Sequence, residues 1–228
     1  MAALRIDGIR ACVFDAYGTL FDVGSVARGA QDTLGERWQA LSDLWRAKQL
    51  QYTWLRGLGG RHADFWQVTG DALDYAMASL GIADNALRDR LLNLYLSISA
   101  YPEVPAMLAE LRSRGIKRAI LSNGTPGMLA AAAMNSGIGE YFDAVLSVED
   151  VGVFKPHPRV YALAPERLGI AAENILFLSS NGWDAFSAKA FGLKVLWCNR
   201  SAQAPERIPA TPDGEIRDLS QLPAMLVA

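Results

Sequence analysis

Five short apolar runs, rich in β-branched residues, constrain the fold more than any other feature of this sequence. They are residues 9–14, 117–122, 143–148, 175–180 and 193–198. Each run has the length and composition of a buried strand. Helical patterns separate the last four runs, and strands that alternate with helices predict a doubly wound α/β fold around a parallel sheet. In such a sheet, ligands bind outside the carboxyl ends of the strands.

Two of the helical patterns carry clear boundary signals. Residues 126–137 begin with a proline in the first turn and stop at a glycine, as helices commonly do. Residues 158–169 follow the same pattern, and Pro165 inside this segment is expected to kink the helix. The Pro-rich stretch 203–213 is expected to be a surface loop that precedes a short final element.

The interval between the first two runs is too long for a single crossover and contains only helical periodicity. One apolar stripe is predicted within it, made of Trp38, Leu41, Trp45, Tyr52 and Leu55. Further helices are expected around residues 63–80 and 85–99. We therefore expect a Rossmann-like α/β core domain of residues 1–20 and 98–228, with an inserted helical cap subdomain of residues 21–97.

Composition and charge exclude several functional classes. The chain has 228 residues, of which 51% are hydrophobic, and this is enough to bury a sizeable core. A formal net charge of −2 without a basic cluster argues against nucleic acid or an anionic membrane as partner. No apolar stretch suggests a signal peptide or a membrane span. Cys12 and Cys198 lie in separate apolar runs without zinc spacing, so buried reduced thiols in a cytoplasmic protein are expected.

Polar residues follow four of the apolar runs. Asp15 comes after the first run, Ser122 and Asn123 end the second, Lys155 follows the third, and the fourth continues into residues 179–184. Taken singly, each of these residues is at least as well explained as a turn, cap or solvated loop residue. Because the carboxyl ends of parallel strands meet at one edge of a sheet, their joint placement predicts a single polar crevice.

The order of these motifs resembles the haloacid dehalogenase superfamily over nearly the whole chain, including the cap. The shared pattern is DxxGT after the first run, then Ser-Asn, Lys-Pro and an Asp-bearing loop. The longer strings DAYGTLFDV, LWRAKQLQYTWLR, ILSNG, VFKPHPRVY and LSSNGWDA are similar to those of the L-2-haloacid dehalogenases. This resemblance implies hydrolysis of L-2-haloalkanoic acids to D-2-hydroxyalkanoic acids through an aspartyl ester, with inversion at C2. It further implies a homodimer, water as co-substrate and halide as product.

Two positions favour a dehalogenase over the magnesium-dependent phosphatases of the same superfamily. Phosphatases place a general acid two residues after the nucleophile, where this chain has Tyr17, whose phenol has an ordinary pKa of about 10. A leaving halide needs no proton, whereas a leaving alkoxide does. Ser180 stands where phosphatases place a carboxylate for magnesium. We therefore expect no metal and no other cofactor. The alternatives are a phosphatase and a hydrolase of a different activated carboxylic acid.

The resemblance implies catalytic roles for Asp15, Thr19, Arg46, Lys155, Ser179, Asn181 and Asp184. Asp15 is the expected nucleophile, Thr19 its hydrogen-bond partner and Arg46 the group that receives the halide. Lys155 is expected to offset the repulsion between Asp15 and the substrate carboxylate. The remaining three would position and activate water, although Asp184 could instead serve mainly by pairing with Lys155.

Substrate-binding roles are implied for Ala16, Tyr17, Leu50, Phe65, Ser122, Asn123, Tyr161 and Trp183. The aromatic members are equally well explained as core residues. On a helix Arg46 shares a face with Leu50 and Trp54, which would direct it into the crevice. From the residues alone, an ion pair between Arg46 and Asp43 is the favoured explanation.

Overall fold

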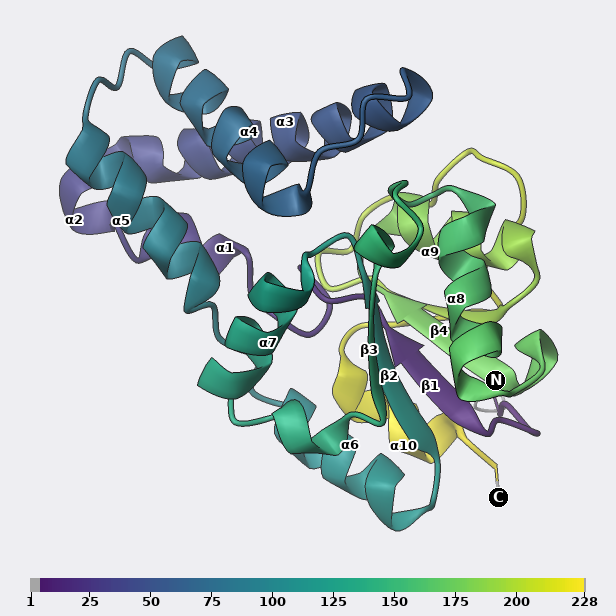
Figure 1. The fold of residues 1–228 in the computed structure, drawn as a ribbon. Coiled ribbons are helices and arrows are strands. Elements are labelled where there is room, and N and C mark those ends of the chain that lie inside the picture. The colour runs from purple at the N-terminus through teal and green to yellow at the C-terminus, as the bar shows by residue number, and fades with distance from the viewer. Residues whose placement is uncertain (1–4, 228) are drawn as a thin grey trace.

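A six-stranded parallel sheet forms the centre of the molecule, as the computed structural model of residues 5–227 shows (Figure 1). The strand order is β3-β2-β1-β4-β5-β6. The strands are β1 (Ala11–Phe14), β2 (Lys117–Ser122), β3 (Ala144–Ser147), β4 (Ile175–Ser179), β5 (Lys194–Cys198) and β6 (Gly214–Ile216). The predicted doubly wound α/β fold is confirmed, and the order of the strands reverses between β1 and β4, where such sheets bind ligands.

The observed strands differ from the five predicted runs mainly at their ends. Four of the strands are one or two residues shorter than their runs, and β2 agrees with its run. The sixth strand, β6, was not among the predicted runs, because three residues at the edge of a sheet carry too little apolar pattern. It directly follows the stretch 203–213, which contains no helix or strand.

Helices cover both faces of the sheet, so the central strands have no polar face (Figure 1). The helices of the core are α6 (Val104–Ser113), α7 (Pro126–Asn135), α8 (Pro158–Leu168), α9 (Gly182–Phe191) and α10 (Leu222–Met225). Helices α8 and α9 pack on one face, and α6, α7 and α10 lie on the other. Gly169 ends α8 in the left-handed conformation, with φ 63°, which glycine adopts at low cost. The predicted stop of α7 at Gly137 is two residues late.

The long interval after β1 is helical and contributes no strand to the described sheet. Its helices are α1 (Gly24–Arg28), α2 (Gln31–Leu34), α3 (Trp38–Leu58), α4 (Phe65–Ser79) and α5 (Asn85–Leu96). They form a group apart from the sheet, beyond the end of β1 (Figure 1). Asp64 and Asp84 cap α4 and α5 by accepting hydrogen bonds from backbone N–H groups three residues later. No helix within residues 5–227 is long and apolar enough to cross a membrane.

The buried face of α3 differs from the predicted stripe in its second half. Leu41 and Trp45 are buried as expected, but Leu55 is 57% exposed. Gln49 and Thr53 occupy the next buried positions at intervals of four residues. Both are polar and hydrogen-bonded, so a search for apolar periodicity alone does not find them.

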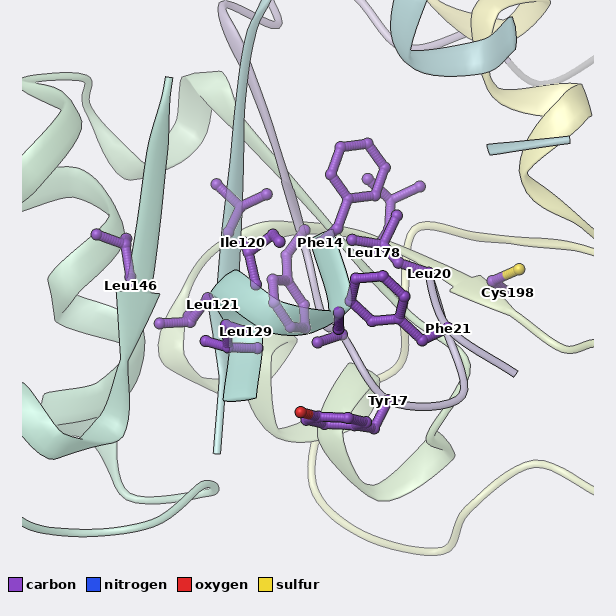
Figure 2. Close-up of a cluster of buried hydrophobic side chains, with 14 of the residues drawn as sticks. Phe14, Tyr17, Leu20, Phe21, Ile120, Leu121, Leu129, Leu146, Leu178 and Cys198 are labelled. Carbon is purple, nitrogen blue, oxygen red and sulfur yellow. The ribbon is translucent and has the colours of Figure 1, made fainter. Parts of the chain in front are cut away.

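Side chains from three neighbouring strands fix the loop that carries Asp15. Phe14 is in register with Ile120 on one side and with Leu178 on the other, and all three are fully buried. Figure 2 shows these side chains in one cluster with Leu20, which follows β1. Burial of each such side chain contributes roughly 1.5–3 kcal/mol, so the start of the loop is firmly anchored. Cys12 and Cys198 are buried and form no disulfide within residues 5–227, which confirms the predicted burial of two free thiols.

Candidate active site

A small cavity lies where the carboxyl ends of the central strands meet the inserted helices. Its lining residues are Asp15, Tyr17, Arg46, Leu50, Phe65, Ser122, Asn123, Lys155, Asn181 and Trp183. Asp15 follows β1 and Ser122 ends β2, whereas Arg46 belongs to α3 and Phe65 to α4. The strand ends and the inserted helices therefore meet at one cavity. Of the other predicted site residues, Ala16, Thr19, Tyr161, Ser179 and Asp184 lie outside the lining.

The carboxylate of Asp15 is held on both oxygens. Oδ1 accepts a hydrogen bond from Lys155 Nζ at 3.0 Å, and Oδ2 accepts from Asn181 Nδ2 at 2.8 Å and from Thr19 Oγ1 at 3.0 Å. Thr19 Oγ1 itself accepts from the backbone N–H of Ser180 at 2.8 Å, which leaves its proton for Asp15. Asp15 is only 6% exposed, so these contacts fix its orientation within the cavity.

Lys155 lies between two carboxylates. Its Nζ is 2.8 Å from Asp184 Oδ2 as well as 3.0 Å from Asp15, and Tyr161 donates to Asp184 Oδ1 at 2.7 Å. Burial alone would lower the pKa of Lys155, but the two carboxylates outweigh it and raise this pKa above its ordinary value. One ammonium cannot neutralise two buried carboxylates. Burial, aided by Asp15, therefore raises the pKa of Asp184 despite the attraction of Lys155.

The Ser-Asn pair at the end of β2, Ser122 and Asn123, supports the segment that carries Lys155. Asn123 Oδ1 accepts from the backbone N–H of Lys155 at 3.0 Å, and Ser122 Oγ accepts from the backbone N–H of Gly124 at 3.1 Å. At the end of β4, Ser179 Oγ accepts from the backbone N–H of Asn181 at 3.2 Å. Its own distance of 3.5 Å from Asp15 Oδ2 makes that contact weak. Hydroxyl and amide groups therefore order both loops beside Asp15.

Arg46 reaches the cavity from the inserted helices. Its Nη2 donates to Asn181 Oδ1 at 3.1 Å, and its Nη1 donates to Gln49 Oε1 at 2.7 Å. The alternative ion pair with Asp43 does not form, because Asp43 accepts from Gln39 at 2.9 Å instead. The guanidinium therefore lies one side chain away from Asp15, with Asn181 between them.

Aromatic side chains form the apolar wall of the cavity. The ring of Tyr17 lies 5.9 Å from that of Phe65 and 5.2 Å from that of Tyr95. Trp183 packs edge-on against Trp54 of α3, with ring centroids 5.4 Å apart. The hydroxyl of Tyr17 is buried and has no hydrogen-bond partner among residues 5–227, and Figure 2 shows it at the edge of the apolar cluster. Burial raises the pKa of Tyr17 well above its ordinary value, so the phenol stays protonated.

Three residues near the cavity were absent from the predicted site. Gln49 and Tyr95 lie behind Arg46, and Gly124 lies so close to Tyr17 that an added Cβ would meet Tyr17 Cε2 at 2.9 Å. Gln49 follows the buried Trp45 by four residues, and this helical spacing was the sequence signal that could have indicated its burial. Nothing beyond helical periodicity in the sequence points to Tyr95.

The donor set does not fit the magnesium site that the phosphatases of this fold use. Both oxygens of Asp184 already accept from buried donors, Lys155 and Tyr161. Ser180 supplies a hydroxyl where a second carboxylate would be needed for the cation. Within residues 5–227 no group of three or more His, Cys, Asp and Glu side chains is placed to hold a metal ion.

Known proteins are similar to this chain in both sequence and fold. A profile of haloacid dehalogenase-like hydrolases matches residues 9–192. (S)-2-haloacid dehalogenase 1 of Pseudomonas sp. (strain CBS-3) is 42% identical over 97% of this chain and 98% of its own length. A dehalogenase solved as an intermediate complex has a TM-score of 0.95 and 42% identity, covering 98% of this chain and 99% of that one. L-2-haloacid dehalogenase of Xanthobacter autotrophicus, solved with chloropropionic acid covalently bound, has a TM-score of 0.86 and 41% identity, covering 95% and 98%. The chain belongs to the haloacid dehalogenase-like hydrolases.

Proposed function

We propose that the protein hydrolyses L-2-haloalkanoic acids to D-2-hydroxyalkanoic acids through a covalent ester on Asp15. The observation that carries this proposal is a buried carboxylate held by Lys155, Thr19 and Asn181 in a small cavity that Arg46 also lines. A carboxylate nucleophile between two cations suits a substrate that is itself an anion. The relative solved with covalently bound chloropropionic acid supports the same chemistry.

In the first step an oxygen of Asp15 attacks C2 of the substrate from the side opposite the halogen. The new C–O bond forms as the carbon–halogen bond breaks, and the halide leaves with the bonding electron pair. Two carboxylates about 4 Å apart repel by roughly 4 kcal/mol at an effective dielectric near 20, and Lys155 offsets this repulsion. Arg46 stabilises the charge that develops on the halide, which is present in the transition state and not in the substrate.

In the second step water cleaves the ester. The water oxygen adds to the carbonyl carbon of the Asp15 ester, and the bond from that carbon to the substrate oxygen breaks. Asp184 accepts one proton of the water and passes it to the departing substrate oxygen, which leaves as the hydroxyl group of the product. The second proton is released when the Asp15 carboxylate is restored. The burial-raised pKa of Asp184 makes it a better base than an ordinary carboxylate. The chiral carbon reacts only in the first step, so its configuration inverts once.

The substrate carboxylate is placed against Ser122 and Asn123, with the backbone amides near Tyr17, and its alkyl group against Leu50 and Trp183. The cavity volume of about 10 Å³ is roughly the room of one water molecule, too small for a haloacid. We therefore infer that residues 21–97 act as a cap that opens to admit the acid and closes to exclude water.

The proposed reaction uses neither magnesium nor a general acid at position 17, because the side chains at the two relevant positions are unsuited to these roles. Tyr17 remains protonated and replaces the acid of the phosphatases, and Ser180 replaces one of their carboxylates.

We further propose a cytoplasmic homodimer. The two unpaired thiols favour a reducing compartment, and exposed Trp54, Leu55 and Leu58 on α3 supply apolar area for association. Light scattering after size-exclusion chromatography tests the dimer.

The decisive test is product analysis with L- and D-2-chloropropionate in the presence of EDTA. We expect chloride release from the L isomer alone, with D-lactate as product and no effect of the chelator. Asp15→Asn is expected to abolish turnover, and Asp43→Asn, an exposed change on α3, is the matched control. Magnesium-dependent phosphate release from phosphomonoesters, without chloride release, would establish the alternative function.

A further inference from the structure

The side chain of Gln49 joins Arg46 to the interior of the inserted helices. Gln49 is 1% exposed, and its Oε1 accepts from Arg46 Nη1 at 2.7 Å. Its Nε2 donates to Thr69 Oγ1 of α4 at 2.7 Å and to Tyr95 OH of α5 at 3.1 Å. One buried amide therefore ties the guanidinium to two further helices.

The direction of these hydrogen bonds fixes which end of the amide faces Arg46. The hydroxyl of Thr69 donates to the backbone carbonyl of Phe65 at 2.6 Å, so its oxygen is left to accept from a neighbour. Only the amide nitrogen of Gln49 can supply that donor, and the amide oxygen must then face the guanidinium. The chain of donors thus runs from Arg46 through Gln49 and Thr69 to the backbone of α4.

The partners of Arg46 are neutral. Both of its side-chain contacts, Gln49 Oε1 and Asn181 Oδ1, are amide oxygens. An amide orients the guanidinium without cancelling its charge, whereas a carboxylate at the same place would form an ion pair with it. The hydrogen bonds from Gln49 and Asn181 therefore orient the guanidinium without tying its charge up in an ion pair.

We propose that Gln49 is a positioning residue that holds Arg46, without forming an ion pair with it, at the place of the leaving halide. The inference rests on the proposed function, in which Arg46 receives the halide. Chloride is a poorer leaving group than bromide and depends more on this stabilisation. Loss of Gln49 therefore slows chloride departure more than bromide departure, an effect that a merely structural role would not produce.

The test compares kcat/KM for L-2-chloropropionate and L-2-bromopropionate, because this constant includes only the steps up to irreversible carbon–halogen cleavage. For Gln49→Met we expect a loss of about 10–100-fold with the chloro acid, the range found for groups that orient metal-ligating side chains from behind. A smaller loss with the bromo acid raises the bromo-to-chloro ratio severalfold. Gln49→Glu keeps an acceptor but adds a charge, and the same change in ratio is expected.

Thr53→Val is the matched control, since Thr53 is buried one turn further along α3. Within the described part of the chain, its hydroxyl donates only to the backbone carbonyl of Leu50. Its bromo-to-chloro ratio is expected to equal that of the wild type. Thermal unfolding identifies variants that do not fold. Tyr95→Phe, which removes one of the two acceptors of Gln49, then tests the same link with a smaller rise in the ratio.

An unchanged ratio in folded Gln49 variants, or equal losses with both acids, would overturn the inference while leaving the proposed function intact. Absence of halide release from the wild-type protein would refute the proposed function itself. The two failures are therefore distinguishable in one set of assays.

Discussion

The ammonium of Lys155 holds together the buried carboxylates of Asp15 and Asp184, and its removal leaves the repulsion between them unopposed. Nζ lies 3.0 Å from Asp15 Oδ1 and 2.8 Å from Asp184 Oδ2, with all three side chains buried. The two oxygens are therefore at most about 6 Å apart, where two negative charges repel by roughly 3 kcal/mol at an effective dielectric near 20. Lys155→Met leaves this repulsion uncompensated.

We expect Lys155→Met to lower the free energy of unfolding at pH 7 by about 3–5 kcal/mol, the usual cost of removing one partner of a buried ion pair. Halide release is expected to be lost as well. The loss of stability shrinks at pH 5. In the variant the folded pKa of Asp184, already raised by burial, rises further, so the folded protein keeps a proton that the unfolded chain releases above about pH 4. The stability of the variant therefore falls as the pH rises through this window.

Urea unfolding at pH 5 and pH 7, followed by tryptophan fluorescence, measures both effects. The matched control is Lys189→Met, which removes a partly exposed ion pair with Asp213 at 2.7 Å. The control is expected to lose less than about 1 kcal/mol, equally at the two pH values. A loss for Lys155→Met that is the same at pH 5 and pH 7, or no larger than that of the control, would refute the reasoning.

Two further predictions follow from single contacts. Tyr161→Phe removes the donor that fixes Asp184 Oδ1 at 2.7 Å, and we expect hydrolysis to slow by roughly tenfold to a hundredfold, with the aspartyl ester detectable by mass spectrometry. Unchanged turnover without ester would contradict this role. Gly124→Ala places a Cβ 2.9 Å from Tyr17 Cε2 and is expected to cost about 1–3 kcal/mol in stability and to reduce activity. Gly127→Ala, with nothing within 4 Å, is its control and should keep wild-type stability or gain slightly.

Features set by local chemistry were predictable from the sequence. The central strands are continuous apolar runs because helices cover both faces of the sheet. Thr125 caps the helix that begins at Pro126, and Gly169 ends the helix that begins at Pro158. These signals depend on a few neighbouring residues and on the period of the element, so the order of strands and helices could be read with small errors at the ends.

Features set by packing between distant segments were not predictable in the same way. The apolar pattern of α3 predicted burial of Leu55, which is exposed, whereas the polar Gln49 and Thr53 are buried. Gln49 donates a hydrogen bond to Thr69 on another helix, and Thr53 donates to the backbone carbonyl of Leu50 in its own helix. Arg46 could equally have paired with Asp43 on its own helix. Only the tertiary structure shows that Asn181 and Gln49 are its partners instead.

By itself, the sequence determined the identity and spacing of the reactive groups: an aspartate after a buried strand, a lysine after another, and a tyrosine where an acid would serve a phosphatase. The tertiary structure decided which of these groups meet. Lys155 is 140 residues from Asp15 along the chain, yet the two are joined because parallel strands place their carboxyl ends at one edge of the sheet. The raised pKa values of Lys155 and Asp184 and the orientation of Arg46 depend on burial and on contacts between distant residues, which no local pattern encodes.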